Sequence, residues 1–350
     1  MKRPEILKIL QELVHARGPS GHEDEVRKYC RKKLTKLCDK ITEDPAGNLI
    51  GFIKGKKSND PIRLMAHMDE LSLIVKRINE DGSLRVNPVG GLLPSDLGQG
   101  PVEILGDTKI FTGIISAHCI HVTEETKGRW RSVPHGEGKM PRWDEMTIFT
   151  GKTVKELEKA GVHSGTRVVV SQSRRQIEEV GSYLGGYFFD NRAAIAIGLC
   201  TLSLMKKKPH QDIYFVLTTE EEIGCHGASF ASRTLPGHTT IAIDVGPAEE
   251  EYAIDLNENP IVVYQDSFGV YTKSLTDDLL KAGKKARLKP QCATWGNYGS
   301  DASAAKRYGQ TAKSGLICIP TRNTHGFEII HKDGIMNVAK LLHTYLSMLN

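Results

Sequence analysis

The stretch Ile213-Tyr-Phe-Val-Leu-Thr-Thr-Glu-Glu-Glu222 joins an apolar run to three consecutive carboxylates. An ionised carboxylate without a partner costs several kcal/mol in an apolar setting, so a buried strand that ends in acids must satisfy them at the edge of a sheet. A metal ion is one counter-charge that meets this need. The stretch therefore predicts a buried strand whose end carries a charged site.

Other apolar or strand-like segments of the chain end in similar chemistry. They deliver His67, Asp69, Asp190, Asp244 and His325. In open α/β sheets, sites are built at the edge formed by the carboxyl ends of the strands. With the acids after residue 219, these segments offer two imidazoles and at least three carboxylates, which suits a two-metal hydrolytic centre.

Each of these residues also has a common structural role when it is taken alone. His67 and Asp69 could form an ion pair, and Asp190 could cap a helix. The acids of residues 220–222 could form a solvated loop. The ensemble favours a site, because the ligand-type residues follow several separate elements of the chain.

Glu221 and Glu222 are adjacent, which suggests a division of labour. In a turn both can point into one cleft, where one carboxylate binds a metal and its neighbour takes a proton from an activated water. Asp69 is suited to accept the second ring N–H of His67, which fixes the tautomer of a metal-bound imidazole.

The chain contains two regions with different sequence patterns. In residues 190–350 strands alternate with helices, which predicts a largely parallel sheet with helices on both faces. From about residue 71 to residue 180, short strand-like pieces are punctuated by Gly, Pro and Asn. We therefore expect an α/β fold with a mostly parallel central sheet flanked by helices, formed by residues 1–70 and 181–350. Residues 71–180 are expected to form an inserted small β-rich domain.

Composition and charge exclude several classes of function. With 39% hydrophobic and 25% charged residues among 350, the chain is typical of a soluble globular protein. The net charge of +5 is small and dispersed, so it does not support nucleic-acid binding. No segment has the roughly 18 apolar residues that cross a bilayer, which indicates no membrane span. Seven cysteines without a CxxC motif favour reduced thiols and a cytoplasmic protein.

Five motifs resemble the M42 family of metallo-aminopeptidases, which includes glutamyl aminopeptidases and the tetrahedral TET peptidases. The motifs are AHMDE (66–70), FFDNR (188–192), EEEIG (220–224), AIDVG (242–246) and Asn323-Thr324-His325. The resemblance covers nearly the full length and includes the inserted domain. It implies a zinc-peptidase-like fold.

The resemblance implies two divalent metal ions per subunit, of Zn, Co or Mn. His67 and Asp244 would hold one ion and Glu222 and His325 the other, with Asp190 bridging both at a separation of about 3.5–4 Å. It further implies that Glu221 is the general base. Asp69 would orient His67.

The resemblance also suggests how substrates and partner subunits bind. Gly299-Ser300-Asp301-Ala302 resembles a segment that lines the family's substrate pocket, so Ser300 and Asp301 are candidate substrate-binding residues. Arg322 is a candidate for binding acidic side chains. Short peptides would bind with their free α-amino group near the metals. Residues 71–180 look like the family's dimerisation domain, which implies a homo-oligomer built from dimers, as in the dodecamers of several family members.

The sequence departs from the family's pattern at several positions. Glu220 stands where Gln is common, Cys225-His226 where Leu-Arg is usual, and Gly326-Phe327 where Ser-Pro is common. The insert holds an unusual stretch at residues 129–143, which includes His135. These changes bear on substrate preference and oligomer size more than on the chemistry.

Three alternatives stay open beside a cytoplasmic metal-dependent aminopeptidase. A glycosidase could use paired carboxylates about 5–9.5 Å apart and needs no metal. A specialised amidohydrolase could act on a non-peptide amide. A metal-binding assembly protein could have lost catalysis, which the intact Glu221 argues against.

Overall fold

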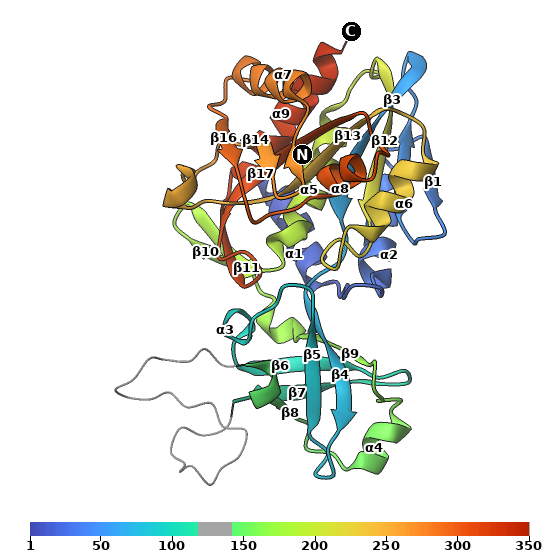
Figure 1. Cartoon of the computed structure of the whole chain (residues 1–350), viewed down its shortest axis with the longest axis vertical. Coiled ribbons are helices and arrows are strands. Elements are labelled where there is room, and N and C mark those ends of the chain that lie inside the picture. Colours follow the sequence, from blue (N-terminus) through green and yellow to red (C-terminus); the bar gives the residue numbers. More distant parts are fainter. Residues whose placement is uncertain (118–141, 350) are drawn as a thin grey trace. The chain divides into compact units, whose positions relative to one another are not determined.

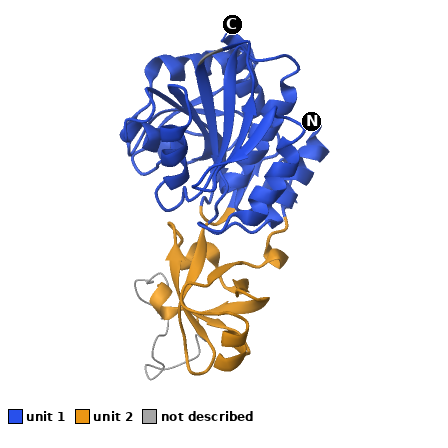
Figure 2. Ribbon diagram, turned by 90° about the vertical axis from the view of Figure 1, so that its right-hand side faces the viewer, with its two compact units in different colours: residues 1–70, 177–324, 328–350 blue, residues 71–176, 325–327 orange. Residues whose placement is uncertain are grey.

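The computed structural model describes residues 1–117 and 142–349. They divide into two compact units, shown in blue and orange in Figure 2. The sheet unit comprises Met1–Glu70, Ile177–Thr324 and Glu328–Asn350, and the barrel unit comprises Leu71–Gln176 and His325–Phe327. The stretch at 129–141 with His135, which the sequence singled out, lies outside the described residues.

The sheet unit is built on one large mixed sheet (Figure 1). Its strands in chain order are β1 (Lys40–Glu43), β2 (Leu49–Ile53), β3 (Lys57–His67), β10 (Glu178–Val180), β11 (Tyr183–Tyr187), β12 (Gln211–Thr218), β13 (Thr239–Pro247), β14 (Ile261–Asp266), β15 (Gly269–Val270), β16 (Gln291–Thr294), β17 (Lys313–Arg322) and β18 (Phe327–His331). In the described part of the chain the main path runs β1-β2-β12-β3-β13-β17-β18-β11-β10.

The middle of this sheet is parallel. β12 pairs with β3, β3 with β13, and β13 with β17, all in the same direction. Parallel strands end at a common edge, so β3, β12 and β13 release their carboxyl ends side by side. The register places Thr218 of β12 opposite His67 of β3. The sheet thus brings three of the segments singled out in the sequence to one edge.

Helices cover both faces of the sheet. They are α1 (Arg3–His15), α2 (Asp24–Leu34), α5 (Phe189–Leu204), α6 (His226–Thr234), α7 (Lys273–Lys285), α8 (Asp301–Arg307) and α9 (Gly334–Met348), with a short 3-10 helix η3 (Glu250–Tyr252). Side chains of α1, α2, α5, α7 and α9 share the largest hydrophobic core. Side chains of α6 and α8 belong to a second core.

The apolar run of β12 is continuous because both of its faces are buried. Phe215 and Leu217 point into the largest core, whereas Val216 between them packs in the core of α6 and α8. Strand side chains alternate between faces, so one apolar run can serve two layers. The predicted fold class is confirmed: a mixed, mostly parallel central sheet lies between two layers of helices.

The barrel unit closes six strands in the order β4-β5-β8-β7-β6-β9. These are β4 (Ser72–Ile78), β5 (Leu84–Val89), β6 (Gly100–Leu105), β7 (Ile110–Ser116), β8 (Thr147–Phe149) and β9 (Arg167–Val170), with helices α3 (Pro94–Leu97) and α4 (Val154–Lys159) and 3-10 helices η1 (Trp143–Glu145) and η2 (Gln172–Arg174). Gly82 turns between β4 and β5 with φ +77°, a conformation that glycine adopts without strain. The short strands that the sequence predicted for the insert therefore form a small barrel.

No helix among the described residues combines the length and the apolar character that crossing a bilayer requires.

Candidate metal centre

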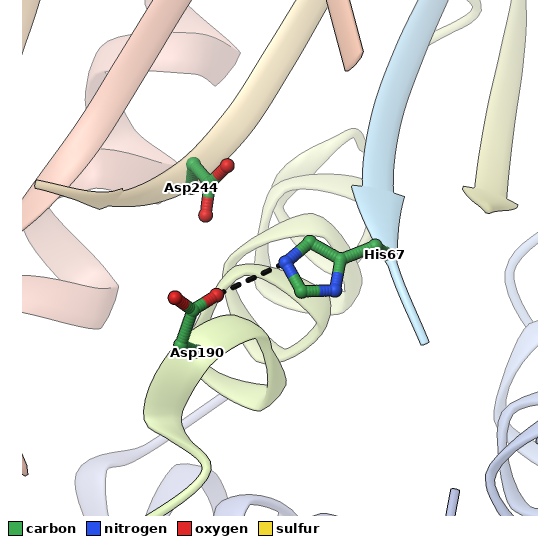
Figure 3. A group of neighbouring side chains, drawn as sticks. All are labelled: His67, Asp190 and Asp244. Atoms are coloured by element: carbon green, nitrogen blue, oxygen red, sulfur yellow. Dashed lines mark hydrogen bonds and ion pairs between the residues drawn. The ribbon is translucent and has the colours of Figure 1, made fainter. Parts of the chain in front are cut away.

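His67, Asp190 and Asp244 point toward one another at the carboxyl edge of the sheet (Figure 3). Each offers one ligand atom, and these atoms all lie within 4.8 Å of one another. His67 ends β3 and is 2% exposed, and its Nε2 lies 3.0 Å from Asp190 Oδ1. Asp244 comes from the neighbouring β13, and Asp190 comes from the start of α5. Two strands and one helix thus build the cluster.

Asp190 lies in the first turn of α5, although an N-cap is the commonest role of such an aspartate when it is read alone. The N-cap of α5 is Phe188, and the backbone of Asp190 is non-helical, with φ −74° and ψ 103°. Its N–H donates to Glu328 Oε2 at 2.9 Å. The carboxylate of Asp190 is aimed at His67, with its Oδ1 3.0 Å from the imidazole Nε2.

Asp69 organises the loop that follows β12 as well as the imidazole of His67. Its Oδ1 lies 3.2 Å from His67 Nδ1 and accepts the backbone N–H of Glu221 at 3.0 Å. Its Oδ2 accepts the N–H of Glu222 at 3.2 Å and the hydroxyl of Ser20 at 2.7 Å. One fully buried carboxylate therefore fixes the histidine and both glutamates of the loop.

Glu221 and Glu222 lie beside the cluster. Glu221 Oε2 is 3.9 Å from His67 Nε2. Ligand atoms of Glu222 and Asp190 lie within 4.8 Å of each other. Both glutamates can therefore face the space in front of His67, as a turn at this point predicts.

Burial and crowding of like charges dominate the electrostatics of the site. Burial raises the pKa of Glu221 to about 8, with Asp301 and Asp69 adding to the rise and His67 opposing it. Burial and the charge of Asp190 raise the pKa values of Glu222 and Asp244 well above the ordinary range. Burial opposes protonation of His67, yet hydrogen bonds to Asp190 and Asp69 raise its pKa well above 6.5. Full ionisation of these acids would therefore place more negative charge in the site than its side chains can neutralise.

The donor set fits divalent metal ions. An imidazole nitrogen and carboxylate oxygens within 4.8 Å of one another are ligands that Zn²⁺, Co²⁺ and Mn²⁺ accept. A cation at this point would also offset the unbalanced charge. The residues of the sheet unit are thus suited in chemistry and spacing to hold a metal.

His325 lies in the connection between β17 and β18 and groups with the barrel unit. Its backbone has φ 69°, and its Nδ1 lies 3.0 Å from the carbonyl oxygen of Gly91 in the same unit. Its pairing with Glu222 at a second metal stays a prediction.

The three predicted substrate-binding residues have different surroundings. Asp301 begins α8, is buried, and accepts the Thr218 hydroxyl at 2.6 Å. Ser300 caps α8 and is fully buried, with its hydroxyl 2.8 Å from that of Tyr271. Arg322 is exposed at the end of β17 and donates to the carbonyl of Ala248. Asp301 therefore lies next to the loop of Glu221, and substrate contacts of the three remain predictions.

The buried ion pair between Arg192 and Glu70 was missed by reasoning from the sequence. Both side chains are fully buried, and the guanidinium donates to Glu70 Oε2 at 2.6 Å. It also donates to the carbonyls of Met68 and Leu13. The pair anchors α5 to the end of β3, so it holds Asp190 and His67 in place. The available signal was that Glu70 and Arg192, which carry opposite charges, end the motifs AHMDE (66–70) and FFDNR (188–192).

The chain is similar in sequence to known peptidases. Residues 47–341 match the family model described as M42 glutamyl aminopeptidase. The chain is 28% identical over 355 residues to the putative aminopeptidase YhfE of Bacillus subtilis, with 97% of this chain and 96% of that protein covered.

Two solved structures show the same fold. Aminopeptidase APDkam598 from the archaeon Desulfurococcus kamchatkensis has a TM-score of 0.90 at 26% identity, with 99% of this chain and 95% of that chain covered. The TET1 peptidase of Pyrococcus horikoshii has a TM-score of 0.84 at 22% identity, with 97% and 98% covered. The family model spans most of the sequence, and the resemblance predicted from the motifs is confirmed. The chain belongs to the M42 glutamyl aminopeptidase family and is a peptide hydrolase.

Proposed function

We propose that this protein is a two-metal aminopeptidase that removes N-terminal residues from short peptides. The observation that carries the proposal is the convergence of His67, Asp190 and Asp244 within 4.8 Å, with the Glu221 carboxylate beside them. The membership of the chain in an aminopeptidase family supports the substrate class.

Asp190 is the proposed bridge between two ions of Zn, Co or Mn. Asp190 belongs to two groups of ligand atoms that lie within 4.8 Å of one another. One group includes His67 and Asp244, and the other includes Glu222. His67 and Asp244 would complete the first site, and Glu222 the second. His325, carried by the turn after β17, is the proposed further ligand of the second site.

When bound, the ions would supply Lewis-acid activation of a water molecule and of the scissile carbonyl. Glu221 would accept a proton from the attacking water at its carboxylate and pass it to the leaving amine. Its pKa of about 8 in the metal-free cluster falls when cations bind nearby, toward a range that suits both accepting and releasing a proton. Asp69 keeps the Glu221 backbone in place through this exchange.

The free α-amino group of a peptide would be held near the metals and acidic side chains, whereas an acylated N-terminus offers no charge. Ser300, Asp301 and Arg322 are proposed to contribute to the substrate pocket.

We further propose that the insert at residues 71–180 is a dimerisation domain. Ile114 of β7 and Phe149 of β8 are register partners and are 49% and 61% exposed, so they form an apolar surface on the barrel unit. The Pyrococcus horikoshii TET1 peptidase assembles into a tetrahedron or an octahedral shell. A homo-oligomer of dimers, with a dodecamer as one such assembly, is the expected state of this chain in the cytoplasm.

Hydrolysis of a panel of aminoacyl p-nitroanilides with added Zn²⁺, Co²⁺ or Mn²⁺ tests the proposal. We expect turnover of substrates with a free N-terminus, none of the N-acetylated counterparts, and loss of turnover on chelation. Cleavage of a polysaccharide that survives complete removal of metal would favour the carboxylate-pair glycosidase instead. Equal cleavage of free and acetylated substrates would refute the aminopeptidase.

A further inference from the structure

Glu221, Cys225 and Asp301 form a cluster of their own within the sheet unit. Each offers one ligand atom, and the three atoms all lie within 4.8 Å of one another. Cys225 stands at the start of α6, and Asp301 is the first residue of α8. Two helices of the same layer thus meet the loop after β12 at this point.

The thiol of Cys225 is directed at the proposed base. It is 3% exposed, and its Sγ donates to Glu221 Oε1 at 3.3 Å. The other carboxylate oxygen of Glu221, Oε2, is the one that faces His67. A single carboxylate therefore lies between the cluster of His67 and a second cluster that contains sulfur.

Asp301 gives a second, independent indication of a ligand site. It is 3% exposed, and its Oδ2 accepts the hydroxyl of Thr218 at 2.6 Å. Its Oδ1 is buried and has no hydrogen-bond partner among the residues that the structure describes. Buried carboxylate oxygens are rarely left without a partner, so this atom is available to a cation.

The three side chains together suit a thiophilic divalent cation. Zinc binds sulfur at about 2.3 Å and carboxylate oxygen at about 2.0–2.2 Å, so ligands around one ion stand roughly 3–4 Å apart. The 3.3 Å between Cys225 Sγ and Glu221 Oε1 falls in this range. Cadmium is softer and favours the sulfur more strongly, whereas Mn²⁺ prefers oxygen ligands.

We propose that Cys225, Glu221 and Asp301 form an additional, inhibitory site for Zn²⁺ or Cd²⁺, apart from the two ions of the proposed catalytic centre. The cation binds the sulfur as a thiolate, and the thiol proton passes to solvent. The cation also binds the carboxylate of Glu221, which can then no longer accept a proton. Excess thiophilic metal therefore inhibits the enzyme. The inhibitory effect, though not the binding, rests on the proposed role of Glu221.

The site depends on the thiol of Cys225, because its other two ligands are carboxylates. The proposed catalytic ligands include no cysteine. A thiolate–metal signal at Cys225 would therefore report only on the additional site.

Cd²⁺ titration of the full-length protein, first equilibrated with Mn²⁺, tests binding directly. The ultraviolet charge-transfer band between thiolate and cadmium is measured for the wild type, Cys225→Ser and Cys225→Ala. Cys292→Ser is the matched control, because it removes an exposed thiol in β16. We expect one thiolate equivalent to be lost in both Cys225 variants beyond any loss in the control. An unchanged band in both Cys225 variants would overturn the proposal.

Zn²⁺ inhibition of the manganese-loaded protein tests the consequence. Activity at each zinc concentration is expressed relative to the same variant without added zinc, so basal differences cancel. Loss of one of three ligands should raise the half-inhibitory concentration by roughly tenfold or more in Cys225→Ser. An unchanged curve would overturn the inhibitory role. If Glu221→Gln kept full activity, the proposed role of Glu221 as the base would be refuted. That result would leave the cadmium band of the wild type in place, so failure of the proposed function can be told apart from failure of the additional site.

Discussion

The carboxylate of Asp69 accepts the backbone N–H of Glu221 at 3.0 Å while it faces the Nδ1 of His67. The proposed base and a proposed metal ligand are therefore tied to one buried acid. Burial would raise the pKa of Asp69, but hydrogen bonds from His67, Ser20 and the Glu221 N–H outweigh it and lower the pKa. Asp69 is thus ionised and acts as a fixed negative charge behind the site.

Asp69→Asn should weaken metal binding by roughly 10–100-fold, because the charge that orients His67 is lost while the shape is kept. Isothermal titration with Zn²⁺ or Mn²⁺ measures this directly. Ser20→Ala, which removes only one donor to Asp69, is the control and should have a smaller effect. Equal affinity in Asp69→Asn and the wild type would contradict the proposed orienting role.

Glu221→Gln should lower kcat by roughly 10²–10⁴-fold with the metal content unchanged, because a neutral amide cannot accept the proton. Metal content is measured by elemental analysis of the same sample. Glu220→Gln is the matched control: it neutralises the adjacent acid, whose side chain is 37% exposed and pairs with His226. A similar loss in both variants would mean that charge near the site, and not the proposed base, is being measured.

Glu70→Gln should destabilise the protein by about 3–5 kcal/mol, because the buried guanidinium of Arg192 is left without its counter-charge. Urea unfolding followed by circular dichroism gives the change in the free energy of unfolding. Lys281→Met breaks an exposed pair with Asp278 and should change stability by less than about 1 kcal/mol. A Glu70→Gln effect as small as that of the control would show that the pair does not anchor α5 to β3.

The metal-free protein should lose stability as the pH rises. Burial is the main cause that raises the pKa values of Glu221, Glu23 and Asp301 to about 8, 7 and 6. An acid whose pKa is raised on folding stabilises the native state below its unfolded pKa of roughly 4. That stability is lost as the pH rises through the folded value. His67, whose pKa is also raised, acts in the same direction.

A divalent metal should therefore stabilise the protein more at pH 8 than at pH 5.5. We expect saturating Mn²⁺ or Zn²⁺ to raise the Tm by roughly 5–10 °C at the higher pH and by less at the lower pH. Thermal scans with metal and with chelator at both values measure the difference. A larger rise at pH 5.5 would contradict the charge balance described for the site.

The fold could be predicted largely from the pattern of the strands. The run 213–217 is continuous in apolar residues because β12 is buried on both faces, and this indicated a parallel sheet with two helical layers. Parallel strands share one edge, so Asp244 was expected near His67, although only His67 ends its strand and β13 continues past Asp244 to Pro247. The position of Asp190 was harder to predict, because no sequence pattern indicates the non-helical start of α5.

Contacts between distant segments could not be predicted. Thr218 and Asp301 meet only because β12 ends beside the start of α8. The loop after β12 turns through positive φ at Glu220 and Cys225, positions that no glycine marks. The hydrogen bonds of Asp69 to this loop depend on that turn, so the sequence indicated its role toward His67 alone.

Anomalous diffraction from crystals soaked in Zn²⁺, recorded above and below the metal edge, tests the central claim most directly. The account predicts a pair of strong peaks about 3.5–4 Å apart, one against His67 and Asp244 and one against Glu222, with Asp190 touching both, apart from any peak at the additional site of Cys225. Side chains of His67, Asp190 and Asp244 without an anomalous peak between them, in crystals of active protein, would contradict it.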